Sequence, residues 1–372
     1  MLRRVFCKLL LVVVVVFSLL VLSGVLLAQG RSEIGLARAI EVQEEHTARL
    51  LAKEGVEGTA IGLDENDRLA IKVFTDGPGV AGIPRNIDGV PVEIVVTGKF
   101  YALKPPADKP GKPPKDPDPE PTIDPTARFD RPVPIGVSTG HFDITAGTIG
   151  CRVTGGGNVY ALSNNHVYAN ENMAGIGDNV LQPGPYDGGT EGTDSSIIDG
   201  DEIGTLAAFV RIDFQPDPDP PYDYQLENTV DAAIALCDGT LDNSTPTGKG
   251  GGYGVPSSST AHAFVGQPVQ KYGRTTGLTK GYVSEINAAV LVGYSNNKVA
   301  LFVNQIVILP NRGRGFSDGG DSGSLIVTDD DIKNPVGLLF AGGGRRTIAN
   351  PIDDVLNALS YEVDDTLAID GD

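Results

Sequence analysis

The stretch Asp318-Gly-Gly-Asp321-Ser322-Gly-Ser-Leu-Ile determines most of what this sequence predicts about fold and chemistry. It places a serine in a glycine-rich turn, and the apolar run that follows is typical of a buried strand. Glycine lets the backbone turn tightly, so that neighbouring N–H groups can point at one spot. Such a pair of donors can hold a negatively charged oxygen. We predict that the N–H groups of Gly320 and Ser322 form this oxyanion hole.

Two segments upstream supply the groups that a serine nucleophile needs. His166 stands on a turn after the apolar run 159–162, and Asp231 stands at the entry to the apolar run 232–236. A serine hydroxyl is a weak nucleophile until a base takes its proton, and histidine can act as that base near neutral pH. A buried carboxylate fixes the histidine tautomer and stabilises its charged form. The sequence therefore predicts His166, Asp231 and Ser322 as a catalytic triad.

The order and the local sequences of these segments resemble those of the trypsin/chymotrypsin family, and the resemblance covers roughly residues 135–360. Asn-His166-Val is similar to the histidine segment of the bacterial members, and Val230-Asp231-Ala-Ala-Ile-Ala-Leu is similar to the aspartate strand. Gly320-Asp321-Ser322-Gly323 resembles the nucleophile motif. The chain also looks like a bacterial group related to the plant narrow-leaf proteins. The resemblance implies a double β-barrel and a serine endopeptidase that works through an acyl-enzyme.

The resemblance also implies which residues meet the substrate. Phe316, six residues before Ser322, takes the position of the pocket floor, and Phe340 and Gly342 lie on the strand expected to pair with the substrate backbone. Without an acid at the floor, we expect small or apolar side chains before the cleaved bond. No activation sequence precedes His166, so Asp321 is expected to have a partner other than a new N-terminus.

Composition excludes several classes of function. The formal charge of −19 repels phosphate backbones, so we expect a protein or peptide substrate and no nucleic acid. There is no CxxC and no His/Cys cluster in the sequence, so we expect neither a metal nor a cofactor. Whether Cys151 and Cys237 pair stays open. His46, His141 and His262 are interpreted as surface or structural histidines.

The first 29 residues have the pattern of an export signal. A basic start is followed by an almost purely apolar run, residues 9–28, which is longer than most cleaved signals. A cleaved signal peptide and a retained membrane anchor both remain open. Either one places the rest of the chain outside the cytoplasmic membrane, secreted or attached through residues 9–28.

The remaining chain divides into three parts. Residues 31–103 are predicted to be a small α/β module, with a helix over 34–53 and strands over 56–63, 69–74 and 90–97. Residues 104–131 are rich in proline and are predicted to be a linker. Residues 132–372 are predicted to be the all-β trypsin-like domain.

This domain is predicted to end in a helix that begins at Asn350-Pro351, and to stay folded when the linker is cut. Its many short apolar runs, separated by Gly, Asn, Asp and Ser, favour a barrel. The alternative function is a catalytically silent binding module on the same fold. An esterase-type hydrolase is disfavoured because its triad runs in a different order.

Overall fold

A computed structural model describes residues 35–105, 122–192, 200–237, 239–311, 313 and 315–372. The predicted export signal and most of the predicted linker lie outside these residues. Among the described residues, no helix combines the length and apolar character needed to cross a membrane.

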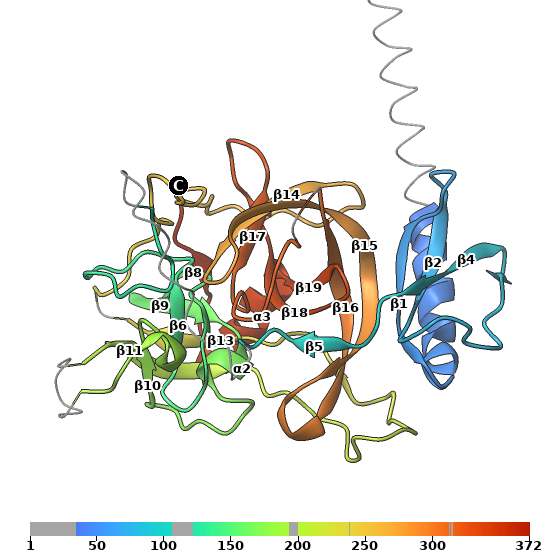
Figure 1. Cartoon of the computed structure of the whole chain (residues 1–372), viewed down its shortest axis with the longest axis horizontal. Coiled ribbons are helices and arrows are strands. Elements are labelled where there is room, and N and C mark those ends of the chain that lie inside the picture. The colour runs from blue at the N-terminus through green and yellow to red at the C-terminus, as the bar shows by residue number, and fades with distance from the viewer. Residues whose placement is uncertain (1–34, 106–121, 193–199, 238, 312, 314) are drawn as a thin grey trace, which may run out of the picture.

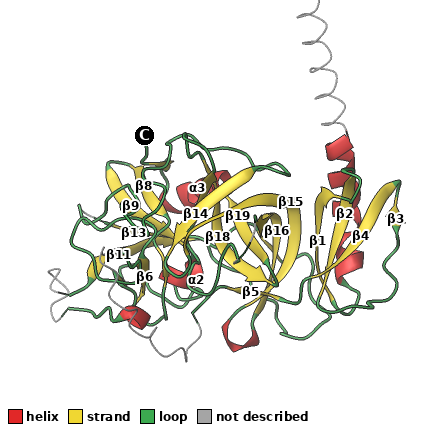
Figure 2. Cartoon of the chain, turned by 45° about the horizontal axis from the view of Figure 1, so that its top comes forward, coloured by secondary structure: helices red, strands yellow, loops and turns green. Residues whose placement is uncertain are grey.

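Six strands of the larger, 12-stranded sheet close into a barrel (Figures 1 and 2). Neighbours pair in the order β14, β15, β16, β19, β18, β17, and β17 returns to β14. The strands are β14 (Pro268–Gly273), β15 (Gly277–Gly293), β16 (Val299–Pro310), β17 (Leu325–Thr328), β18 (Pro335–Gly343) and β19 (Arg346–Pro351). The short β12 (Glu227–Asn228) pairs with β16 outside the closed ring. The β-branched and aliphatic residues of these strands fill the barrel interior.

The smaller, 8-stranded sheet carries the first half of the predicted domain. Its order is β20, β8, β9, β13, β11, β10, β6, β7. The strands are β6 (Ser138–His141), β7 (Gly147–Thr148), β8 (Cys151–Gly155), β9 (Asn158–Ser163), β10 (Asn179–Leu181), β11 (Glu202–Phe209), β13 (Ala233–Leu236) and β20 (Ala368–Ile369). The short helices are α2 (Asn165–Tyr168), η1 (Pro185–Asp187) and η2 (Ser295–Asn297). The predicted all-β architecture of two barrel-like sheets is confirmed.

The predicted C-terminal helix is confirmed as α3 (Ile352–Val363), although its start differs from the expectation. Asn350 does not cap the helix. It lies in β19, where its side chain accepts a hydrogen bond from the N–H of Asp231 (3.1 Å) and donates one to Gln305 (2.7 Å). Because the Asn350 side chain bonds to Asp231 and Gln305, it does not cap the helix as the local pattern predicts. Pro351 takes the N-cap position.

The front module contains a helix over residues 35–51, three strands close to the predicted ranges (β1, β2 and β4) and one short strand that was not predicted (β3). These are β1 (Val56–Leu63), β2 (Leu69–Thr75), β3 (Asn86–Ile87) and β4 (Val90–Val96). Strand β1 pairs antiparallel with residues 285–290 of β15, directly beyond the part of β15 that pairs with β14. The front module and the six-stranded barrel therefore share one sheet. This barrel follows the 8-stranded sheet in chain order and is called the second barrel below. The boundary drawn at residues 104–131 stays a prediction.

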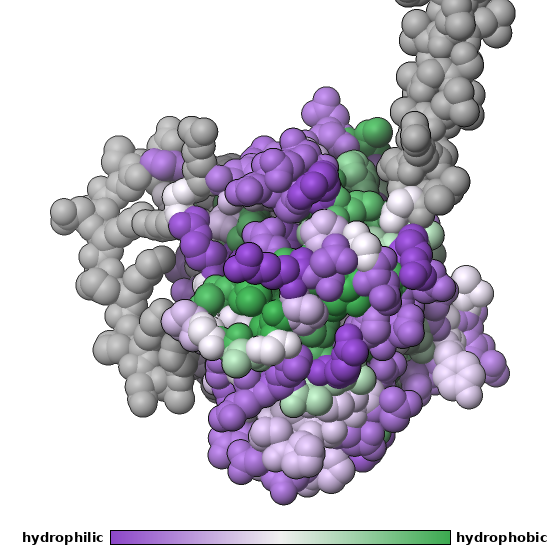
Figure 3. All heavy atoms as spheres, turned by 90° about the vertical axis from the view of Figure 1, so that its right-hand side faces the viewer, coloured by the Kyte–Doolittle hydropathy of each residue, from purple (hydrophilic) through white to green (hydrophobic). Residues whose placement is uncertain are grey.

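The outer face of the front module carries a band of hydrophobic side chains between hydrophilic rims (Figure 3). Ile94 and Val96 of β4 are about half exposed. After β4 the chain enters β5 (Phe100–Ala102), which leads from the module toward the junction of the two barrels (Figure 1).

Candidate functional site

Strand pairing brings His166 and Asp231 together. Strands β9 and β13 are antiparallel neighbours, His166 follows the end of β9 on α2, and Asp231 precedes β13. Nδ1 of His166 donates to Oδ2 of Asp231 (2.6 Å), and both side chains are buried. Because a carboxylate only accepts, the proton of a neutral imidazole sits on Nδ1. Nε2 is then free of a proton, which is the state that a general base requires.

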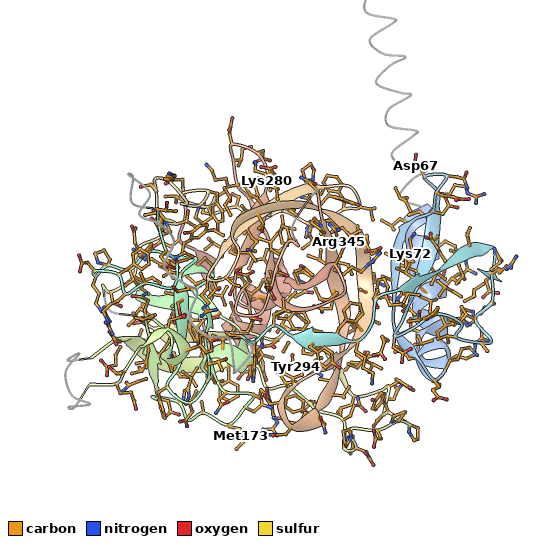
Figure 4. The ribbon with its side chains drawn as sticks, viewed as in Figure 1. Asp67, Lys72, Met173, Lys280, Tyr294 and Arg345 are labelled. Carbon is orange, nitrogen blue, oxygen red and sulfur yellow. The ribbon has the colours of Figure 1, made fainter. Side chains whose placement is uncertain are left out.

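Three further residues hold Asp231 in place. Its Oδ2 accepts a hydrogen bond from the hydroxyl of Tyr294 (2.8 Å), its carbonyl accepts one from Asn164 (2.7 Å), and its N–H donates to Asn350. Burial, together with the charge of Asp231, raises the pKa of Tyr294 well above its ordinary value, so the phenol stays a donor. Figure 4 shows Tyr294 below β5. No local sequence pattern marked Tyr294, and the pattern at Asn350 predicted a helix start instead of a contact with Asp231.

The turn that carries Ser322 packs against the end of β9. Gly320 and Gly323 have φ angles of +97° and +92°, a region that side chains disfavour. A Cβ on Gly323 would lie 2.2 Å from Oγ of Ser163, three residues before His166. The hydroxyl of Ser322 donates to the carbonyl of Phe340 (3.1 Å). Nε2 of His166 has no hydrogen-bond partner among the described residues. The structure thus joins His166 to Asp231 but does not bond Ser322 to His166.

Asp321 has a buried network in place of an N-terminus. Its Oδ1 accepts from the N–H groups of Thr275 (2.9 Å) and Thr276 (3.1 Å), and its Oδ2 accepts from Oγ1 of Thr276 (2.7 Å). Nζ of Lys271 lies 3.5 Å from Oδ2, and both side chains are fully buried. Burial lowers the pKa of Lys271, while the charge of Asp321 opposes this. The segment after β14 therefore supports the predicted oxyanion turn.

Replacing Lys271 by Met should destabilise the protein by about 3 kcal/mol, because removing one partner leaves the other charge buried. The exposed ion pair of Lys280 with Asp329 (2.6 Å) provides the control. Lys280→Met should cost about 0.5 kcal/mol or less. Urea unfolding of both variants measures the difference. Equal losses in the free energy of unfolding for the two variants would contradict the role given to Lys271.

Of the three predicted substrate-binding residues, Gly342 lines a cavity of about 330 Å³ at the edge of the second barrel. Phe316 is buried in an apolar cluster against which the lining residue Leu103 packs, and Phe340 packs on Phe302, with ring centroids 4.7 Å apart. The lining residues are Leu103, Gly313, Gly315, Ser317, Asp318, Gly342, Gly343, Gly344, Arg345, Arg346 and Thr347. Neither Phe316 nor Phe340 is among these lining residues.

The chain's own residues 100–105 run through this site. Strand β5 pairs antiparallel with β18, Ala102 opposite Ala341 and Tyr101 opposite Gly342. The N–H of Leu103 then donates to the carbonyl of Phe340 (3.1 Å), and the carbonyl of Leu103 accepts from the N–H of Gly320 (2.7 Å). Ser322 and His166 are 0% and 1% exposed. The sequence assigned residues 31–103 no position in the site.

Lys104 is bound by a carboxylate that the sequence analysis did not single out. Glu171 accepts from Nζ of Lys104 (2.5 Å) and from Nζ of Lys298 (2.6 Å), and it is 3% exposed. Burial favours the neutral acid, but the two ammonium groups and the N–H of Ser295 outweigh it and lower the pKa of Glu171 to about 2. Glu171 has a φ of +55°, which is unfavourable for a side chain of this size.

The pKa of Glu171 predicts an acid-sensitive contribution to stability. The folded pKa lies below the ordinary value of 4.5, so the stabilisation is complete above pH 4.5 and is lost as the pH falls toward 2. We expect Glu171→Gln to lower the melting temperature at pH 6, with the gap to the wild type closing between pH 4.5 and 2. Replacing the exposed Glu362 by Gln should leave the melting temperature unchanged. A gap independent of pH would contradict this account.

The other histidines and the two cysteines contact groups outside the site described above. His141 is buried and lies 3.1 Å from Asp178, while the exposed His262 lies 3.4 Å from Asp353. His46 pairs with Asp88 at the surface of the front module (2.9 Å). The two cysteines left open, Cys151 and Cys237, are buried and not bridged to each other.

Parts of this chain are similar in sequence to one family model and to one curated plant protein. A family model described as the Nal1 C-terminal domain matches residues 248–351. Protein NARROW LEAF 1 of rice, Oryza sativa subsp. japonica, is 29% identical over 225 residues, which cover 54% of this chain. The chain spans about a third of the length of that curated relative (35%). These are similarities of part of the chain.

The solved structures compared are serine proteases at low identity. A glutamic acid-specific serine protease with a histidine triad in substrate binding has a TM-score of 0.40 and 20% identity, covering 64% of this chain and all of the other. Thermobifida fusca protease A has a TM-score of 0.40 and 16% identity with the same coverage. The geometry described above is independent of these matches.

Proposed function

We propose that this chain is an exported serine endopeptidase that hydrolyses peptide bonds through an acyl-enzyme on Ser322. His166 acts as the general base, Asp231 orients it, and the N–H groups of Gly320 and Ser322 hold the oxyanion. The observation that carries the proposal is the His166–Asp231 pair beside a turn whose Gly320 N–H already binds a peptide carbonyl. The export pattern of residues 1–29 supports action outside the cytoplasmic membrane.

One observation favours the alternative, a binding module without catalysis. The hydroxyl of Ser322 donates to the carbonyl of Phe340 instead of to His166, and the site is filled. A fluorophosphonate probe separates the two functions, because it reacts with an activated serine. Leu103→Asp/Lys104→Glu should vacate the site, since both new carboxylates disfavour docking. Labelling of this variant that disappears with Ser322→Ala supports the endopeptidase, and an unlabelled variant supports the binding module.

We expect an apolar preference before the cleaved bond. Leu103, which lines the cavity, packs against the apolar cluster that contains Phe316, and among the described residues the only acid that lines the cavity is Asp318. Profiling against a peptide library should give aliphatic or small residues at this position. Strong selection for Lys or Arg would show that Asp318 acts as the specificity determinant in place of Phe316.

A further inference from the structure

We propose that the Leu103–Lys104 peptide bond of this chain is a substrate of its own Ser322. This inference rests on the proposed endopeptidase function and names its first substrate. It also assigns Glu171 as the group that selects a basic residue directly after the cleaved bond.

The backbone of residues 101–103 is held along the edge that faces β18. β5 pairs with β18 through Tyr101 and Ala102, and the N–H of Leu103 continues the ladder to Phe340. Strand addition of this kind fixes an extended peptide in register. The register ends at Leu103, because its carbonyl leaves the ladder and accepts from Gly320, two residues before Ser322. The bond presented to the serine is therefore the one between Leu103 and Lys104.

The side chain before this bond is matched by its surroundings. Leu103 lines the 330 Å³ cavity and packs against the apolar cluster that contains Phe316. A Cβ added to Gly342 would lie 3.3 Å from Cδ1 of Leu103, so the leucine already occupies the space above this glycine. An aliphatic side chain thus fills the part of the site where we expect an apolar preference.

The side chain after this bond is matched by charge. Nζ of Lys104 reaches Glu171 (2.5 Å) and Oγ of Ser295 (3.0 Å). Glu171 belongs to the loop after α2, where Asn170, Glu171 and Asn172 all have positive φ angles. Unfavourable backbone conformations of this kind concentrate at functional sites. This loop therefore places the buried carboxylate of Glu171 beside Lys104, the residue on the leaving side of the scissile bond.

The path of the chain beyond Lys104 stays close to the turn. A Cβ on Gly319 would lie 2.4 Å from the carbonyl oxygen of Lys104 and 3.4 Å from Cα of Pro105. The segment thus crosses the site from β18 to the turn before Ser322, as a substrate bound on both sides of its scissile bond would.

The reaction consumes one water and needs no other reactant. Oγ of Ser322 rotates from the Phe340 carbonyl, bonds to the carbonyl carbon of Leu103 and passes its proton to Nε2 of His166. The carbonyl electron pair moves onto the oxygen held by Gly320. Collapse breaks the bond to the nitrogen of Lys104, which takes the proton from His166. Water then cleaves the acyl-enzyme by the same steps and leaves Leu103 as a carboxylate.

A time course of intact mass under denaturing conditions tests the cleavage in the full chain. The wild type should convert to two fragments divided between Leu103 and Lys104, and Ser322→Ala should stay intact. Leu103→Asp/Lys104→Glu should be cut at least about tenfold more slowly, since it loses the apolar and ionic contacts. The same variant should react with the fluorophosphonate probe at least as fast as the wild type.

The outcomes separate this inference from the proposed function. An intact wild type whose Ser322 is labelled in the opened variant would overturn self-cleavage and leave the endopeptidase standing. Cleavage that persists in Ser322→Ala, or that falls at another bond, would also overturn it. A chain that is neither cut nor labelled would refute the endopeptidase itself.

The role of Glu171 has its own measurement. The hexapeptide Phe-Tyr-Ala-Leu-Lys-Pro, which copies residues 100–105, is compared with the same peptide carrying Glu in place of Lys. The processed wild type should prefer Lys by about tenfold or more in kcat/KM, and Glu171→Gln should reduce that ratio to about threefold or less. An unchanged ratio in Glu171→Gln would overturn the assignment, whatever the effect on overall activity.

Discussion

Ser322→Ala is expected to lower kcat/KM toward peptides by about 10⁴-fold or more, and His166→Ala should do the same. Each change removes one member of a unit, because the hydroxyl is no better than water without the base and the base has nothing to activate without the hydroxyl. The double variant should therefore be little worse than either single one.

Ser324→Ala is the matched control for this prediction. Its hydroxyl lies in the same turn and donates to the carbonyl of Asp321 (2.6 Å), so its loss tests the shape of the turn alone. We expect less than about a tenfold change in kcat/KM for this variant. Losses in the double variant that add on a logarithmic scale would show that His166 and Ser322 do not act together.

Asp231→Asn is expected to lower kcat by about 10⁴-fold while the fold stays intact. An asparagine amide that faces Nδ1 of His166 would favour the tautomer with its proton on Nε2, and that imidazole cannot accept the serine proton. Tyr294→Phe removes one donor to the same carboxylate, so we expect about a tenfold loss. Turnover of a peptide substrate, with melting temperatures as the control for folding, measures both.

The acid assignment has a clear competitor. The Asp187 side chain is 9% exposed and pairs with Arg274, whose N–H donates to Thr148 beside the Ser322 turn. Full activity of Asp231→Asn together with inactivity of Asp187→Asn would transfer the orienting role to Asp187. Retained activity of Asp187→Asn is expected, because among the described residues the acid bonded to His166 is Asp231.

The sequence predicted the elements that have local patterns. Strand β1 matches its predicted range, and the His166 and Ser322 turns lie where an apolar run meets small and polar residues. Lys271, Tyr294 and Glu171 were missed because each meets its partner only after the barrels form. Side chains of a strand alternate between its two faces, and a lysine usually lies on the exposed face. The local sequence does not indicate that Lys271 points inward.

The same reason explains the two larger surprises. Asn350 has a local cap pattern, yet a partner 119 positions away in sequence, Asp231, takes its side chain. Leu103 stands in a stretch that sequence composition assigns to the border of a linker, and its position in the site depends on the pairing of β5 with β18. Side-chain contacts across long sequence separations have no periodicity from which to read them.

The pairing of β1 with β15 determines what a cut after Leu103 would produce. β1 is joined to residues 285–290 of β15 by backbone hydrogen bonds, and the front module packs on Leu291 and Leu301. Breaking one covalent bond removes none of these contacts, so the two pieces would remain one particle in native buffer. Departure of the front piece would leave part of β15 as an open strand edge, which recruits other chains. The mature form would then be a stable complex of two polypeptides from one gene.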